Sequence, residues 1–157
     1  MDVAQYLKVQ ELNARYVRTI DEDRLEAWPD FFTEDARYRI ITVDNLEQGL
    51  PLGMVYASSR AMLRDRVRAL REANVYEAQR YRHIIGPPLI DAAEAGEVRA
   101  ETSFMVARIM HTGETMLFAT GRYEDRILLD GPDGPRFAEK LVVLDSRQVD
   151  TLLAIPL

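Results

Sequence analysis

The second half of the chain restricts the fold most, because apolar and polar residues alternate there over long segments. Four strands are predicted, over residues 80–91, 98–110, 115–129 and 137–145. Turn sequences at residues 111–114 (HTGE) and 130–134 (DGPDG) separate the last three strands. Tight turns of this kind favour antiparallel neighbours. In the second strand one face is expected to carry Val98, Ala100, Thr102, Phe104, Val106 and Met110.

The first half is mainly helical in pattern. Apolar residues at three- and four-residue intervals predict an amphipathic helix over residues 6–20, ending near an acidic cluster at 21–23. A short second helix is expected over residues 24–32, with Pro29 awkwardly placed inside it. Ser58 or Ser59 can cap a third helix that runs to about residue 71. The residues expected to face inward from this helix are Met62, Leu63, Val67 and Leu70.

A further strand is predicted over residues 36–43, where Arg37 and Arg39 alternate with Tyr38 and Ile40. Helices therefore come first and antiparallel strands later, which is an α+β arrangement. The chain of 157 residues has no Ser/Pro/Gly-rich linker, so a single domain over residues 1–157 is expected. In that domain a curved antiparallel sheet packs against the N-terminal helices.

Composition excludes several classes of function. The net charge of −6 disfavours nucleic acid as a partner, because phosphates require a positive field. Residues 1–20 carry regularly spaced charges, so neither a signal peptide nor a membrane span is expected, and the predicted location is cytoplasmic. With no cysteine and two histidines, the chain has no ligand set for a Rieske centre and a poor one for mononuclear iron. We therefore expect no metal ligand and no cofactor-binding residue in this chain.

One constellation could carry acid–base chemistry in a cone-shaped sheet, namely Tyr38, Asp35 and His83. It would suit a stand-alone isomerase or dehydratase. The alternative for His83 is structural, because a strand histidine more often bonds a neighbour and fixes packing. The sequence alone leaves both interpretations open.

Several residues are candidates for a subunit interface. The third helix carries arginines on its polar face, and these could dock onto an acidic partner surface, although such arginines usually face only water. The run at residues 151–157 (TLLAIPL) is almost wholly apolar, so it should pack on its own domain or against another subunit. The predicted interface residues are Arg60, Arg64, Arg68, Arg82, His83, Leu152, Leu153, Ile155 and Leu157.

Several segments together resemble the small, or β, subunits of aromatic-ring-hydroxylating dioxygenases, over essentially the whole chain. They are residues 28–39 (WPDFFTEDARYR), 62–67 (MLRDRV), 81–84 (YRHI) and 143–146 (VLDS). Within that family, four more segments are similar to the terephthalate 1,2-dioxygenase group. These are residues 43–45 (VDN), 70–77 (LREANVYE), 109–115 (IMHTGET) and 150–157 (DTLLAIPL). Salicylate 5-hydroxylase small subunits share several of the broader motifs.

The resemblance implies a cone-shaped fold of the nuclear transport factor two and SnoaL type. It further implies an α3β3 assembly in which this chain self-associates as β3 and supports a large α subunit. That large subunit would hold a Rieske [2Fe–2S] cluster and a mononuclear Fe(II), reduced from NAD(P)H through a reductase. No catalytic residue is carried over to this chain. The implied reaction is cis-dihydroxylation of an aromatic carboxylate, with terephthalate as the substrate.

Overall fold

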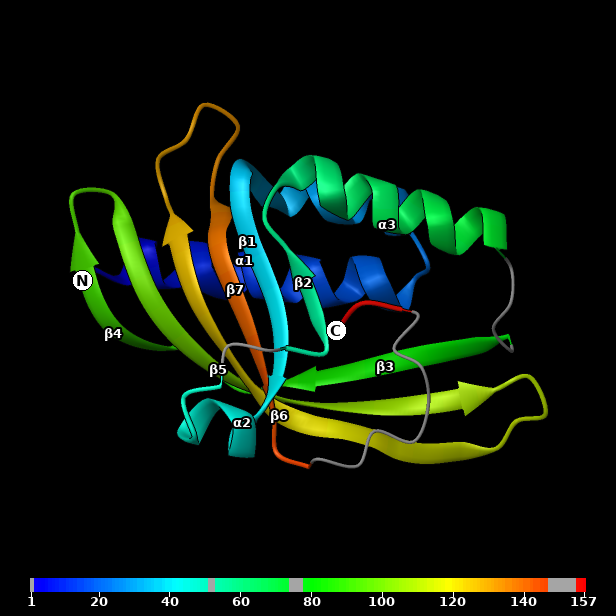
Figure 1. Ribbon diagram of the computed structural model, residues 1–157. Coiled ribbons are helices and arrows are strands. Elements are labelled where there is room, and N and C mark those ends of the chain that lie inside the picture. Colours follow the sequence, from blue (N-terminus) through cyan, green and yellow to red (C-terminus); the bar gives the residue numbers. More distant parts are fainter. Residues whose placement is uncertain (1, 51–52, 74–77, 147–154) are drawn as a thin grey trace.

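A strongly curved sheet forms one wall of a cone, and helices form the rest (Figure 1). The computed structural model describes residues 2–50, 53–73, 78–146 and 155–157. Helix α1 (Val3–Asp21) lies along one face of the sheet, and α3 (Arg60–Ala73) and the 3-10 helix η1 (Leu25–Phe31) complete the cone. The predicted α+β cone is thus confirmed.

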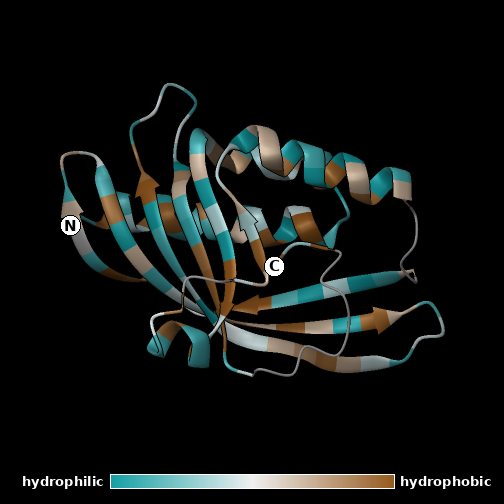
Figure 2. Ribbon diagram, viewed as in Figure 1, coloured by the Kyte–Doolittle hydropathy of each residue, from teal (hydrophilic) through white to brown (hydrophobic). Residues whose placement is uncertain are grey.

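The sheet contains β1 (Phe32–Thr42), β2 (Val55–Ala57), β3 (Gln79–Ile85), β4 (Leu89–Glu94), β5 (Glu97–Met110), β6 (Thr115–Leu128) and β7 (Arg136–Leu144). Its order is β2-β1-β7-β6-β5-β3, with β4 also pairing with β5. Hydrophilic and hydrophobic residues alternate along these strands (Figure 2). The short helix α2 (Val43–Glu47) and strand β2 were not predicted.

Two sequence expectations about the sheet require correction. The β1–β7 pair is parallel, whereas the other strand pairs described are antiparallel. Because most of the chain lies between β1 and β7, their connection is long enough for the parallel arrangement. The strand predicted over residues 80–91 is two strands, β3 and β4. They pair with successive parts of the same β5 edge and are separated by Gly86, Pro87 and Pro88.

The helices follow the predicted pattern with small differences. Helix α1 begins with a capping box between Asp2 and Gln5. The segment around Pro29 is a continuous 3-10 helix, η1, and the proline ring is buried. In α3 the Ser59 hydroxyl accepts a hydrogen bond from the Met62 main-chain N–H at 3.2 Å. Met62 itself is 42% exposed, so its expected inward position was wrong.

Strands β6 and β7 come into close backbone contact at Gly121 in β6. A Cβ atom built there would lie 2.0 Å from the main-chain oxygen of Val143, so no other residue fits without moving β7. The β5–β6 register shifts between Val106 and Ala107, which is a β-bulge. These two features let the 14-residue strands β5 and β6 curve around the helices.

Candidate functional site

Aromatic side chains fill the interior of the cone. Tyr16 of α1 makes edge-on contacts with rings from η1, β1, β6 and β7, the shortest at 5.3 Å to Phe137. Trp28 packs edge-on against Tyr38 at 5.2 Å. The space in which a cone-shaped enzyme would hold a substrate is therefore largely occupied by this chain's own side chains.

The final residue of the sequence also enters this interior. The hydroxyls of Tyr16 and Tyr38 both donate to the main-chain oxygen of Leu157, at 2.7 and 3.0 Å. The Leu157 N–H donates to the Tyr38 oxygen at 3.2 Å, and the Trp28 indole N–H donates to the Tyr16 oxygen at 3.1 Å. Burial raises the pKa of Tyr16 and of Tyr38 above the ordinary value, so both phenols stay protonated donors.

A buried ion pair crosses the same interior. The Lys140 Nζ lies 3.1 Å from both carboxylate oxygens of Asp125, and both side chains are fully buried. The ammonium also lies 3.9 Å from the ring centroid of Tyr123 and 4.0 Å from that of Phe137. Burial raises the pKa of Asp125 to about 6, although Lys140 acts in the opposite direction, and burial lowers the pKa of Lys140.

Sequence reasoning missed this pair, although a signal was present. Lys140 occupies an inward position in β7, in phase with Val142 and Leu144. It is also one of only two lysines in the chain. A charge at an inward position of an apolar strand predicts a buried partner, but not which strand supplies that partner.

His83 is held by a carboxylate at the end of α1. The Asp21 Oδ1 lies 2.6 Å from the His83 Nδ1, and Asp21 Oδ2 accepts the His83 main-chain N–H at 2.8 Å. The two side chains are 0% and 4% exposed. This contact joins β3 to α1, and it supports the structural interpretation of His83 over the catalytic one.

The structure does not assemble the proposed acid–base group. Asp35 is exposed and accepts a hydrogen bond from the Thr33 hydroxyl. The Tyr38 hydroxyl bonds Leu157, and His83 bonds Asp21. The expectation of a Tyr38, Asp35 and His83 constellation is therefore wrong, and the isomerase or dehydratase interpretation loses its basis.

The predicted interface residues fall into two groups. Arg64, Arg68 and Arg82 are exposed, while the Arg60 Nε donates to the main-chain oxygen of Phe32 at 2.9 Å. His83, Ile155 and Leu157 are buried within their own chain. Leu152 and Leu153 lie outside the described residues. The exposed arginines are therefore the members of this set whose placement suits contact with another subunit.

An apolar strip on the outer face of the sheet was not predicted. Ile84, Met105 and Leu117 are 59%, 43% and 61% exposed. Ile84 pairs directly with Met105, and Arg82 and Leu117 both pair with Ala107 in adjacent positions. Their side chains thus share one face over β3, β5 and β6. Such a strip is a typical subunit contact.

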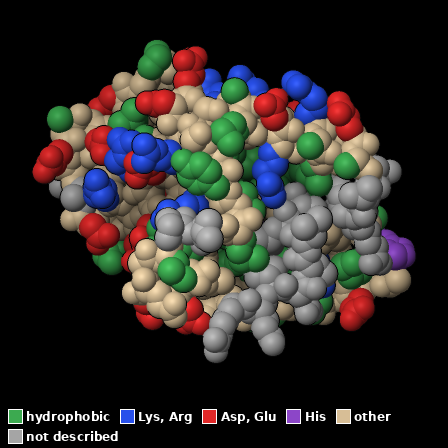
Figure 3. All heavy atoms as spheres, in the orientation of Figure 1, with side chains coloured by type: hydrophobic (Ala, Val, Ile, Leu, Met, Phe, Trp, Pro, Cys, Tyr) green, Lys and Arg blue, Asp and Glu red, His purple; other side chains and the backbone are tan. Residues whose placement is uncertain are grey.

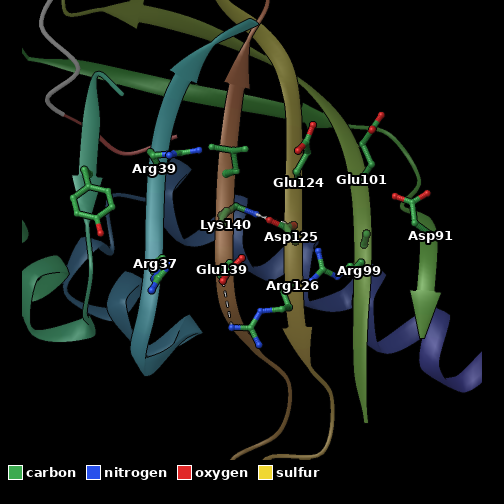
Figure 4. A pocket seen from close by; sticks show the side chains of 13 residues that line it. Arg37, Arg39, Asp91, Arg99, Glu101, Glu124, Asp125, Arg126, Glu139 and Lys140 are labelled. Atoms are coloured by element: carbon green, nitrogen blue, oxygen red, sulfur yellow. Dashed lines mark hydrogen bonds and ion pairs between the residues drawn. The ribbon is translucent and has the colours of Figure 1, made fainter. Parts of the chain in front are cut away.

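The other half of the outer sheet face contains a charged hollow of about 560 Å³ (Figures 3 and 4). Arg37 and Arg39 of β1 line one side, and Asp91 of β4 and Glu101 of β5 line the other. Between them Arg126 lies 3.5 Å from Glu139. Ion pairs this accessible stabilise a fold very little, so the hollow is suited to polar contact with another molecule.

The described residues show neither a metal site nor a membrane helix. No group of three or more His, Asp or Glu side chains that could hold a metal ion occurs among them. No helix in the same part of the chain is long and apolar enough to cross a bilayer.

Comparison with known proteins identifies the class. The model of the SnoaL-like domain family matches residues 1–139. The β subunit 1 of the terminal oxygenase component of terephthalate 1,2-dioxygenase from Comamonas sp. is 50% identical over 96% of this chain and 97% of its own length. The anthranilate 1,2-dioxygenase small subunit of Burkholderia cepacia is 40% identical over 99% and 96%.

A solved structure supports the same class. It is assigned as the β subunit of an aromatic-ring-hydroxylating dioxygenase from Novosphingobium aromaticivorans, and it is 37% identical with a TM-score of 0.90. The match covers 99% of this chain and 100% of that one. The chain therefore belongs to the SnoaL-like family and, within it, to the β subunits of aromatic-ring-hydroxylating dioxygenases.

Proposed function

We propose that this chain is the non-catalytic β subunit of an α3β3 dioxygenase that converts terephthalate to a cis-dihydrodiol. The observation that carries the substrate assignment is the 50% identity, over 96% of the chain, to a terephthalate 1,2-dioxygenase β subunit. The Rieske [2Fe–2S] cluster and the mononuclear Fe(II) belong to the large subunit in this proposal. Electrons reach them from NAD(P)H through a reductase, which is consistent with a cytoplasmic complex.

The filled cone supports a structural role. Three polar groups inside the cone, Tyr16, Tyr38 and Lys140, already bond another group of this chain. His83 is likewise held by Asp21. The His83 Nε2 and the Tyr123 hydroxyl have no such partner among the described residues, but most of the interior is held by contacts within the chain, which suits a rigid base for a larger partner.

Three surfaces are available for assembly. The apolar strip suits the β–β contact, because a trimer closes with one repeated heterologous interface and buries the strip on every copy. The exposed arginines of α3, Arg64 and Arg68, suit an acidic surface of the large subunit. The charged hollow carries both arginine and carboxylate side chains, which could contact another β subunit or the large subunit.

The test is co-expression with a large subunit of a terephthalate 1,2-dioxygenase, followed by oxygen-uptake assays. We expect a stable complex with equal amounts of both chains and faster uptake with terephthalate than with salicylate, anthranilate or benzoate. Preference for salicylate, with hydroxylation in place of dihydroxylation, would favour a salicylate 5-hydroxylase small subunit. Absence of any complex would contradict the assembly itself.

A further inference from the structure

The mouth of the cone is closed by Ile155, Pro156 and Leu157. All three are buried, and Leu157 is 0% exposed. They belong to no helix or strand. Ile155 and Leu157 nevertheless join the hydrophobic core that α1 and the sheet build. The segment therefore lies inside the fold without being part of its regular framework.

The main chain of this segment is recognised by side chains. Both the N–H and the carbonyl oxygen of Leu157 bond tyrosine hydroxyls, which come from α1 and β1. Among the described residues, the hydrogen bonds of residues 155–157 all go to these two hydroxyls. Segments built into a fold usually pair main chain with main chain, whereas a docked peptide is held by pocket side chains and by burial of its own side chains.

The two tyrosines are also held by contacts that do not involve residues 155–157. Tyr16 is held by the Trp28 indole and by the surrounding rings, and Tyr38 packs edge-on against Trp28 and Phe32. Both hydroxyls are deeply buried, so an empty site would leave two donors without a partner. A peptide residue with a branched aliphatic side chain meets both needs, because its carbonyl oxygen accepts from the two hydroxyls and its side chain fills the apolar space.

We propose that the cone is a peptide-binding site and that the chain's own residues 155–157 occupy it as a docked ligand. The ligand class is a short apolar peptide with a branched aliphatic residue whose carbonyl accepts from Tyr16 and Tyr38. Two consequences follow. The segment leaves the cone by a local opening while the sheet stays folded, and a free peptide of the same chemistry takes its place.

The first experiment uses a chain that ends at residue 154 and the peptide N-acetyl-Ile-Pro-Leu. We expect the truncation to lower the Tm by roughly 5–10 °C, because burial of the two large side chains is lost. The peptide should restore the Tm saturably, whereas N-acetyl-Ile-Pro-Asp should not, and Tyr38→Phe in the truncated chain should weaken the rescue at least tenfold. An unchanged Tm, or a lowered Tm that the peptide cannot raise, overturns the proposal.

The second experiment keeps the full chain and decides the matter even if the truncated chain does not fold. Because the chain has no cysteine, Leu157→Cys gives it a single thiol. We expect this thiol to react with a disulfide reagent at least 100-fold more slowly than the control Thr112→Cys, in an exposed turn. Its rate should depend on urea much less steeply than global unfolding does, since local opening exposes little surface. If the labelling rate instead rises with urea as steeply as global unfolding does, the segment is an integral part of the core and the proposal is overturned.

Discussion

At the scale of single residues, the Lys140–Asp125 pair is the most consequential contact. Its two charges are fully buried, and their attraction must offset a large desolvation cost. Three rings surround the ammonium and provide part of that compensation. The raised pKa of Asp125 shows that desolvation outweighs the attraction by Lys140.

This balance predicts a pH dependence of stability. The folded chain keeps a proton on Asp125 up to about pH 6, whereas the unfolded chain loses it near the ordinary value of 3.8. Stability from this group is therefore fully present below about pH 4 and is lost as the pH rises through 6. Between pH 4.5 and 6.5 the free energy of unfolding of the unmutated chain should fall by about 1–2 kcal/mol more than that of the Asp125→Asn variant. Urea unfolding of both chains at the two pH values measures this, and equal changes would contradict it.

His83 gives a second prediction at this scale. Replacing it with Ala leaves the Asp21 carboxylate buried and, among the described residues, with the main-chain N–H of residue 83 as its one remaining hydrogen-bond donor. The free energy of unfolding should fall by about 1.5–3 kcal/mol, the range for a hydrogen bond to a charged group. Turnover per assembled complex should stay within about twofold, because the residue serves packing. A loss of several orders of magnitude with assembly intact would instead indicate a chemical role.

At the scale of elements, the sheet presents different chemistry on its two faces. Its inner face holds the aromatic core, and its outer face is charged over β1, β4, β6 and β7 but apolar where β3, β5 and β6 run together. The edge strand β3 contributes both Arg82 and Ile84 to the apolar half. An exposed apolar strip at a sheet edge promotes aggregation of an isolated chain, so we expect another subunit to cover it in the assembly.

Substitutions in the apolar strip should affect self-association without affecting the stability of the single chain. The double variant Ile84→Lys/Met105→Lys should leave the Tm within about 2 °C, because both side chains are already exposed to water. It should nevertheless abolish self-association by placing two charges in the apolar contact. Leu7→Lys on α1, where Leu7 is 54% exposed, is the matched control and should assemble normally. Light scattering reports both masses, and an unaffected double variant would place the interface elsewhere.

At the scale of the whole molecule, the cone is closed by its own parts. Helix α1, the 3-10 helix, the sheet and Leu157 all meet at Tyr16 and Trp28. Because residues 155–157 and the core side chains fill the interior, the surfaces exposed for subunit assembly are the outer face of the sheet and the arginines of α3. This arrangement suits a subunit that holds larger partners in position.

The isolated chain should therefore form a trimer. Its mass in solution should be close to three times the 18.0 kDa of one chain, since a ring of three copies covers the apolar strip on each. Analytical ultracentrifugation over a hundredfold range of concentration measures this. A species that remains monomeric at the highest concentration would mean that the large subunit, and not the β–β contact, covers the strip.

Local patterns in the sequence determined the elements of the fold. Alternation located the strands over β5, β6 and β7, helical spacing located α1 and α3, and the absence of cysteine excluded a Rieske centre from this chain. Those features depend on neighbours along the chain, so they can be read without knowing what lies across the core. Helix α2 and strand β2 were missed because each is too short to show a period.

Only the tertiary structure decided the long-range pairs. Lys140 with Asp125, His83 with Asp21, and Leu157 with Tyr16 and Tyr38 join residues whose partners are set by strand order and sheet curvature. The sequence predicted a hydrogen-bond partner for His83, whereas the need of Lys140 for one was missed; in both cases a buried polar group can be satisfied from any element that packs against it. The strand order β2-β1-β7-β6-β5-β3 and the close packing of β6 on β7 at Gly121 determine which elements meet inside the cone, and this chain's own side chains fill that space.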